Sequence, residues 1–197
     1  MTEMKPVPAA TVVLVRENAK LATLEVLLLR RNSKLAFHGG HWVFPGGRVD
    51  PADFAASATG LEYQAALKAA VRETEEEAGI VLREELLIHV AHWTTPPRLP
   101  RRFCTWFFVY PLVESVTVQV DNDEILEHRW VTPAQALLEA EQELLILPRP
   151  TTVTLQDLTP HQSLPQLVQA VTESNIRVFP EDSVYYQPRQ MGCHEPE

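Results

Sequence analysis

Three glutamates with helical spacing, Glu73, Glu76 and Glu77, lie in the middle of the chain, within residues 61–80. At about 100° per residue, positions three and four apart lie on the same side of a helix. Carboxylate oxygens are the ligands that Mg²⁺ and other hard divalent cations take, usually together with phosphate groups of a substrate. The alternative is a solvated acidic face, partly neutralised by the nearby Arg72. The spacing alone leaves both interpretations open.

The residues around these glutamates predict the helix that carries them. Thr59 suits the N-cap position, Glu62 follows three residues later as in a capping box, and Gly79 stands where a left-handed C-cap is expected. Small and apolar residues recur at spacings of three and four and predict one buried face. These residues are Leu67, Ala70, Val71, Thr74 and Ala78. We therefore expect a helix over residues 61–80 that presents the three glutamates along a second face.

Residues 72–80, RETEEEAGI, resemble the second half of the Nudix box, R-E-(aliphatic)-x-E-E-x-G-(aliphatic), with Thr74 at the first aliphatic position. Upstream, residues 44–47, FPGG, are similar to the turn that opens the same box. Gln64 occupies the place of a further glutamate of the box, and residues 48–60 contain an insertion before the helix. On these motifs the chain resembles the Nudix hydrolase family.

The resemblance implies a metal-dependent hydrolase of diphosphate bonds. Glu73, Glu76 and Glu77 would bind Mg²⁺ or Mn²⁺, which neutralises charge on the diphosphate and activates a water molecule. One of these glutamates would also serve as the base, and the sequence does not say which. Arg72, one turn before Glu76, would hold that carboxylate in place.

Two regions outside the box helix supply further candidates for the metal site. Gly47 belongs to the turn, where the lack of a side chain lets the backbone approach a ligand closely. Nudix proteins also place an acidic residue before a tryptophan of a later strand, and Glu124 or Glu127 fits that position. The alternative for either acid is a solvated position beside a strand.

Residues 27–47 keep the register of an upstream signature found in Nudix enzymes that cleave coenzyme A. Arg31 and Gly40 fall in place, whereas Ala36 stands where the signature has a second arginine. The inserted segment and residues 93–108 also resemble one Nudix subgroup, that of the coenzyme A diphosphatase called nudix motif 19 and its relatives. Coenzyme A or acyl-coenzyme A is therefore the favoured substrate, with ADP-ribose or NADH as the alternative.

Three arginines lie in a proline-containing loop before an aromatic strand that starts at Phe103: Arg98, Arg101 and Arg102. Guanidinium groups bind diphosphate oxygens in a bidentate manner. An aromatic ring, Phe103 or Trp93, would stack on a nucleotide base. The alternative is a solvated loop with the aromatic rings in the core. Together with Arg31, the loop arginines and Phe103 are the predicted substrate contacts.

Composition limits the partners of the chain. A formal net charge of −9 argues against a broad nucleic-acid footprint, and it would repel an anionic substrate unless local arginines and a metal invert the field at the site. The family resemblance implies a small-molecule nucleotide as the partner. No run approaches 18 apolar residues and residues 1–10 lack an apolar export core, so we expect no membrane contact and a cytoplasmic location. Cys104 and Cys193 do not form a disulfide framework, and the seven histidines lack the spacing of a zinc site.

The order of the predicted elements gives an α/β fold. Apolar runs at 10–15 and 24–29 predict a hairpin, and further strands and helices follow the box helix. This order argues for a mixed sheet with helices on its faces, and the resemblance sharpens it to the Nudix α/β/α sandwich with a C-terminal helical extension at 148–172. We expect one domain over residues 1–180 and a mobile tail at 181–197.

Shorter signals complete the prediction. Asp50 and Pro51 predict a short helical turn, Thr132 begins a helix that reaches Glu143, and Thr159 caps a last helix. Nudix proteins commonly dimerise, so the resemblance allows a homodimer. A hypothesis of another class is a non-catalytic nucleotide-binding sensor that keeps the fold; the presence of all three box glutamates argues against it.

Overall fold

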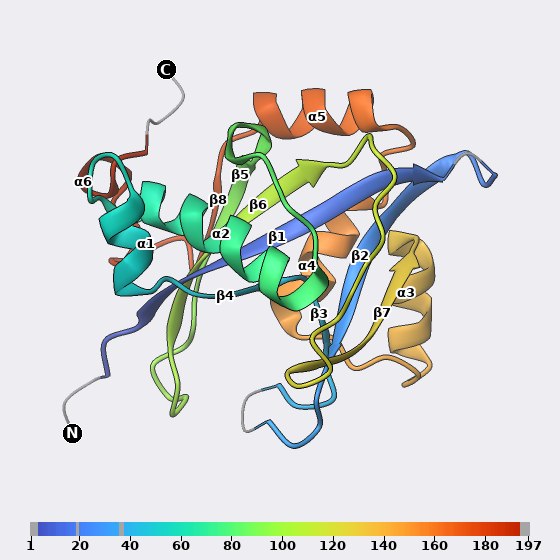
Figure 1. The fold of residues 1–197 in the computed structure, drawn as a ribbon, viewed down its shortest axis with the longest axis horizontal. Coiled ribbons are helices and arrows are strands. Elements are labelled where there is room, and N and C mark those ends of the chain that lie inside the picture. Colours follow the sequence, from blue (N-terminus) through green and yellow to red (C-terminus); the bar gives the residue numbers. More distant parts are fainter. Residues whose placement is uncertain (1–3, 19, 36–37, 194–197) are drawn as a thin grey trace.

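A computed structural model describes residues 4–18, 20–35 and 38–193 of the chain. Within these ranges the strands form one eight-stranded sheet in the order β3-β2-β1-β6-β5-β8, with β4 paired to β1 and β7 paired to β2 (Figure 1). The strands are β1 (Val7–Asn18), β2 (Thr23–Arg31), β3 (Trp42–Val43), β4 (Gly46–Arg48), β5 (Ile88–Thr94), β6 (Phe103–Pro111), β7 (Ile125–Val131) and β8 (Arg177–Phe179). The sheet is mixed, because β1 pairs in parallel with β6 and antiparallel with β2.

Helices pack on both faces of this sheet (Figure 1). They are α1 (Pro51–Ala56), α2 (Glu62–Ala78), the 3₁₀ helix η1 (Glu84–Leu86), α3 (Pro133–Glu141), α4 (Arg149–Leu158), α5 (Leu164–Glu173) and α6 (Pro188–Met191). No helix in the described ranges combines the length and the apolar character that crossing a membrane requires.

Strand β1 at the centre of the sheet separates two hydrophobic layers. Val12 and Leu14 pack with the alanines of α2, whereas Val13 and Val15 pack with residues of α3, α4 and α5. This alternation follows from the two-residue period of a strand, and a strand apolar at every position has both faces covered. The hairpin predicted from residues 10–15 and 24–29 is confirmed, with longer strands than the apolar runs.

Helix α2 ends as predicted but begins differently. Gly79 is its C-cap with a left-handed φ of 67°, whereas the N-cap is Leu61 and not Thr59. Thr59 instead donates its backbone N–H and its hydroxyl to Gln64 Oε1, at 3.2 and 3.3 Å. Glu62, the expected partner in a capping box, accepts the indole N–H of Trp106 at 3.0 Å. The predicted box is wrong because a fully buried indole needs an acceptor, and Glu62 supplies it.

The C-terminal third contains the predicted helices with shifted ends. Thr132 is the N-cap of α3 as predicted, but α3 ends at Glu141 rather than Glu143, whose φ of 59° is not helical. Ser163, not Thr159, caps α5 and accepts the N–H of Gln166. Thr159 lies at the end of α4, where its hydroxyl donates to a carbonyl of the preceding turn.

The segment after β8 packs against the core, in contrast to the mobile tail expected at 181–197. Tyr186 and Met191 join the hydrophobic layer beneath α2, and Cys193 is buried with them. A Cβ on Gly192 would lie 2.8 Å from the Leu61 side chain, so this segment reaches the start of α2. Residues 194–197 lie outside the described ranges.

Candidate active site

The C-terminal end of α2 contacts the glycine turn, residues 44–47, through Glu77. The Glu77 side chain is only 5% exposed, and its Oε2 accepts the backbone N–H of Gly46 at 2.9 Å. Gly46 begins strand β4, which pairs antiparallel with β1, so the predicted turn is in part a short strand. A Cβ on Gly46 would lie 2.2 Å from the carbonyl oxygen of Ala10, and Gly46 has a φ of 153°. Only glycine therefore allows β4 to lie between β1 and the Glu77 carboxylate.

Gly47 brings a second carboxylate to the same backbone. A Cβ at this position would lie 2.3 to 2.5 Å from the three carboxyl atoms of Glu73. Burial, as the largest cause, raises the pKa of Glu73 against the opposing effect of its hydrogen bond with Arg72. Glu73 and Glu77 thus contact adjacent glycines of one strand, so the box helix and the glycine turn lie side by side.

Arg72 donates hydrogen bonds to several groups on the solvent-facing side of this site. Its Nη1 donates to Glu73 at 2.9 Å and to Glu76 at 3.0 Å, which is the predicted contact with Glu76. Its Nη2 donates to Asp53 Oδ2 at 2.9 Å and to the carbonyl of Arg48 at 3.0 Å. Hydrogen bonding to Asp53 is the largest of the causes that raise the pKa of Arg72. The guanidinium therefore ties the box helix to β4 and to α1.

Asp53 supports the site, although it is not among the residues that the sequence predicts there. It lies in α1 within the inserted segment, is 4% exposed, and accepts both Arg72 and the backbone N–H of Asp50. The helical turn predicted from Asp50 and Pro51 is confirmed. An acid three residues after an N-cap was its sequence signal, although that pattern alone reads as a helix cap.

Arg31 joins Glu77 to a residue from a different part of the sheet. Its Nη1 lies 3.6 Å from Glu77 Oε1, and its Nη2 lies 3.5 Å from Glu124 Oε2. Glu127, the other candidate acid, pairs instead with Arg30 at 2.8 Å on an exposed part of the surface. The structure therefore brings Glu124 to the site and leaves Glu127 outside it.

The electrostatics of the site favour a cation. The pKa of Glu77 is raised to about 8, with burial as the largest cause and the charges of Glu73 and Glu124 acting in the same direction. The Gly46 N–H and Arg31 oppose this rise. Oxygen donors that repel one another at a glycine-lined backbone fit the ligand chemistry of Mg²⁺ or Mn²⁺. In the described part of the chain, however, no three acidic, histidine or cysteine side chains are grouped closely enough to hold a metal ion as they stand.

Glu76 does not share the buried position of the other two box glutamates. Its side chain is 59% exposed, and it forms an ion pair with Arg72 at 3.0 Å. The three glutamates predicted on one face therefore differ in environment: Glu77 is buried, Glu73 is half-buried and Glu76 faces solvent.

The predicted substrate contacts divide into two groups. Arg98 and Arg101 are exposed, as residues that meet a ligand can be. Arg102 differs from the prediction: it is 3% exposed and donates to the carbonyls of Met4 and Thr95 at 2.7 and 3.1 Å. Its guanidinium also lies over the ring of Tyr185. Arg102 therefore ties the loop to Met4 before β1 and to Tyr185 in the segment after β8.

The two aromatic residues proposed to stack on a nucleotide base, Trp93 and Phe103, differ in their surroundings. Trp93 stacks on Phe179 with ring centroids 3.8 Å apart, so its face is already covered. Phe103 is half-buried at the start of β6. Ala36, where the coenzyme A signature has its second arginine, lies outside the described ranges.

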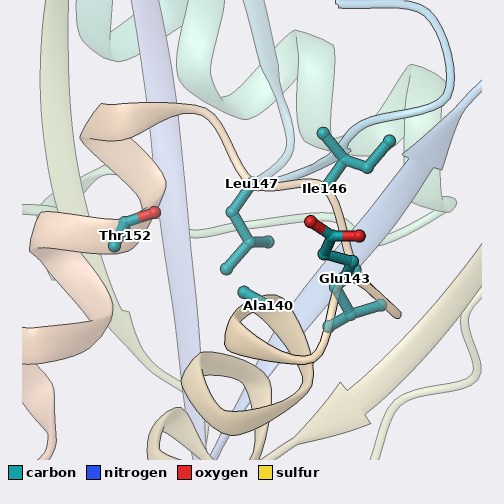
Figure 2. A pocket seen from close by; sticks show the side chains of 6 residues that line it. Ala140, Glu143, Ile146, Leu147 and Thr152 are labelled. Atoms are coloured by element: carbon teal, nitrogen blue, oxygen red, sulfur yellow. The ribbon is translucent and has the colours of Figure 1, made fainter.

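A separate hollow lies between α3 and α4, on the face of the sheet away from α2. Figure 2 shows Leu147, Ala140 and Thr152 around it, with the Glu143 carboxylate nearby. Glu143 is the only titratable side chain among its lining residues. This hollow lacks the donors that diphosphate chemistry needs, so the carboxylate site at α2 is the candidate active site.

Comparisons with known proteins agree with this site. A family profile for the NUDIX domain matches residues 5–149. The "Putative nudix hydrolase 7" of Caenorhabditis elegans is 27% identical over 172 residues, which covers 70% of this chain and 56% of that protein. The chain thus spans little more than half the length of that curated relative.

Solved structures show the same fold. A NUDIX hydrolase from Alicyclobacillus acidocaldarius aligns with a TM-score of 0.73 at 24% identity, over 82% of this chain and 95% of that chain. An Ap4A hydrolase from C. elegans aligns with a TM-score of 0.51 at 26% identity, over 79% of this chain and 98% of that chain. The predicted α/β/α fold with a mixed sheet is confirmed. Because the NUDIX profile covers most of the sequence, including the glycine turn and all three box glutamates, the chain belongs to the NUDIX domain family.

Proposed function

We propose that this protein hydrolyses the diphosphate bond of a nucleoside diphosphate linked to another group, with Mg²⁺ or Mn²⁺ as cofactor. The observation that carries the proposal is the contact of Glu77 and Glu73 with the adjacent glycines Gly46 and Gly47. Glu124 adds a third carboxylate across Arg31. Such a set of oxygen donors suits a hard cation that is shared with substrate phosphates.

The residues have distinct roles in this proposal. Glu73, Glu76, Glu77 and Glu124 hold the cation, with the backbone of Gly47 beside them. When bound, the cation supplies charge neutralisation on the diphosphate and an activated water molecule. Arg72 orients Glu73 and Glu76, and one of the box glutamates accepts the proton of the attacking water. Arg98 and Arg101 meet the phosphates.

Coenzyme A or acyl-coenzyme A is the substrate we propose first. The order of Arg31, Gly40 and the FPGG turn supports it. The Ap4A hydrolase among the structural relatives supports a second candidate class, nucleotides joined through phosphates to another nucleoside, to which NADH also belongs. ADP-ribose shares the diphosphate that both classes present.

The test is turnover on a panel of coenzyme A, acyl-coenzyme A, ADP-ribose, NADH, Ap4A and a nucleoside triphosphate, with Mg²⁺ and with Mn²⁺. Chromatography resolves the products. Release of 3′,5′-ADP and 4′-phosphopantetheine from coenzyme A supports the first substrate. Preference for ADP-ribose, NADH or Ap4A supports the alternatives and makes the arginine loop the place to seek specificity.

Glutamine variants test whether the carboxylates perform the reaction. Glu77→Gln and Glu76→Gln should lower kcat by at least about 100-fold, because each removes a charge from the proposed cation site. Glu75→Gln is the matched control, since Glu75 is an exposed neighbour in the same helix turn. Full activity in both variants would contradict the proposal. Nucleotide binding without hydrolysis of any panel member would favour the sensor.

A further inference from the structure

Arg31 is held at the site by charge rather than by well-formed hydrogen bonds. Its contacts with Glu77 and Glu124 measure 3.6 and 3.5 Å, longer than the 2.7 to 2.9 Å that is usual for a charge-assisted hydrogen bond. The Nε of Arg31 is buried and lacks a hydrogen-bond partner within the described ranges. A buried donor without an acceptor costs free energy. The position of the guanidinium therefore leaves part of its hydrogen-bonding capacity unused.

The backbone around Arg31 aims the side chain at this position. The pairing of β2 with β7 shifts register between Arg30 and Arg31, and Arg31 lies opposite Ile125, next to Glu124. The N–H of Asn32 donates to the carbonyl of Glu124 at 2.7 Å and fixes that segment. The extra residue of this bulge lies in β7, and it brings Glu124 beside Arg31. Arg30 and Arg31 face opposite sides, as neighbouring residues of a strand do, so Arg30 pairs with Glu127 and Arg31 points into the site.

The charge balance of the site suggests what this guanidinium does. It lies between the carboxylates of Glu77, in α2, and Glu124, the residue before β7. Within the described part of the chain, no three acidic, histidine or cysteine side chains are grouped to hold a metal ion as they stand. A cation that binds both Glu77 and Glu124 must displace Arg31, because like charges repel at this separation.

We propose that Arg31 is an exchangeable counterion: it pairs with Glu77 and Glu124 before a divalent cation binds, and it moves to the substrate diphosphate once the cation replaces it. This inference rests on the proposed function and deepens it. The unsatisfied Nε then gains an acceptor oxygen from the diphosphate. The binding of the cation and that of the diphosphate are then coupled. The cation binds the two carboxylates more tightly once Arg31 has moved to the diphosphate, and the diphosphate binds more tightly once the cation has released Arg31.

The first test measures Mn²⁺ affinity without substrate, from the free Mn²⁺ signal in electron paramagnetic resonance. Arg31→Gln should bind Mn²⁺ more tightly than the wild type by about tenfold, within the usual range of coupling between linked sites. Arg31→Lys keeps a competing charge and should stay close to the wild type. Arg30→Gln is the matched control, because Arg30 pairs with the exposed Glu127 and should leave the affinity unchanged. Circular dichroism checks that each variant is folded.

The second test measures ADP affinity by calorimetry, with and without Mn²⁺. The gain in ADP affinity that Mn²⁺ brings should be at least about fivefold smaller in Arg31→Gln than in the wild type. Equal or weaker Mn²⁺ binding by a folded Arg31→Gln overturns the exchange, and Arg31 then orients the carboxylates. Where the wild type still binds Mn²⁺ and hydrolyses a diphosphate, this result for Arg31→Gln contradicts only the exchange and leaves the proposed function standing. A wild type that neither binds Mn²⁺ nor hydrolyses any diphosphate removes the proposed function as well.

Discussion

The carboxylate of Glu77 accepts the backbone N–H of Gly46 at 2.9 Å, joining the end of the box helix to the first residue of β4. This bond satisfies one oxygen of a buried acid and sets the separation between helix and strand. Glu73 lies one helical turn before Glu77, on the same side of α2, and Gly47 follows Gly46 in β4. Glu73 therefore lies against Gly47 as Glu77 lies against Gly46. The site therefore depends on two residues without side chains as much as on the acids.

Gly47→Ala should impair the site with little effect on the rest of the fold. The added methyl group would lie 2.3 Å from the Glu73 carboxyl carbon, so this carboxylate must move away from β4. We expect kcat to fall by about 10- to 100-fold, the range seen when groups that orient metal ligands are lost. Steady-state kinetics measure it. Gly60→Ala is the control, since nothing lies within 4 Å of its Cβ; its φ of +67° adds a backbone strain that Gly47 does not have. Equal activities of the two variants would contradict the expectation.

Asp53→Asn should weaken both stability and turnover. The variant leaves Arg72 without its buried carboxylate partner, so we expect a loss of about 2 kcal/mol in the free energy of unfolding, below the range for fully buried pairs. Turnover should also fall, since Arg72 positions Glu73 and Glu76. Urea unfolding and kinetics measure the two effects. Asp50→Asn is the control, because Asp50 is 50% exposed and lies 3.9 Å from the guanidinium. A smaller effect of Asp53→Asn than of this control would disprove the assignment.

His92 should make the protein less stable in acid. Burial lowers its pKa to about 3, and both ring nitrogens lack a hydrogen-bond partner within the described ranges. The unfolded chain takes up a proton near pH 6.5 while the folded protein does not, so stability falls as pH decreases from about 6.5 towards 3.

His92→Phe should flatten this dependence by about 1.4 kcal/mol per pH unit. A phenyl ring suits the surroundings, since Trp106 and Tyr186 lie 5.0 and 4.8 Å from the His92 ring. His89, whose pKa burial lowers to about 4, keeps part of the slope in the variant. Urea unfolding at pH 5 and pH 7 measures the difference. The same slope in wild type and variant would show that His92 is protonated in the folded state.

Tyr186→Ala should destabilise the fold although Tyr186 lies outside the expected domain. Its ring packs against His92, His89 and Trp106 beneath α2. Removing the ring should cost about 2 to 3 kcal/mol, somewhat below the range for a fully buried aromatic side chain. Thermal unfolding measures the loss. Val184→Ala is the control within the same segment, because Val184 is 69% exposed. Wild-type stability of Tyr186→Ala would restore the expectation of a mobile tail.

Local patterns predicted the elements of the fold and the existence of the site. The apolar runs predicted the hairpin of β1 and β2, and Gly79 predicted the end of α2, because strand alternation and left-handed caps are properties of short segments. Helical spacing likewise brought the box glutamates together. Each of these predictions depends on residues only a few positions apart.

Contacts between distant segments decided which of the candidate residues form the site. Helical spacing could not tell that β4 would cover Glu77 and leave Glu76 in solvent, because burial depends on the element that packs against the helix. The register shift opposite β2 placed Glu124 in the site. Arg102 was drawn inward by acceptors at Met4 and Thr95.

Short segments of the sequence encode the order of the elements, the motif that marks the family and the acidic residues that suit cation chemistry. Only the folded chain shows that Asp53 supports Arg72, that Arg31 lies between Glu77 and Glu124, and that the segment after β8 packs against the core. A charge or a buried ring is stabilised by whichever partner the folded chain brings within a few ångströms. That partner is set by sheet register and helix packing, which no short stretch of sequence encodes.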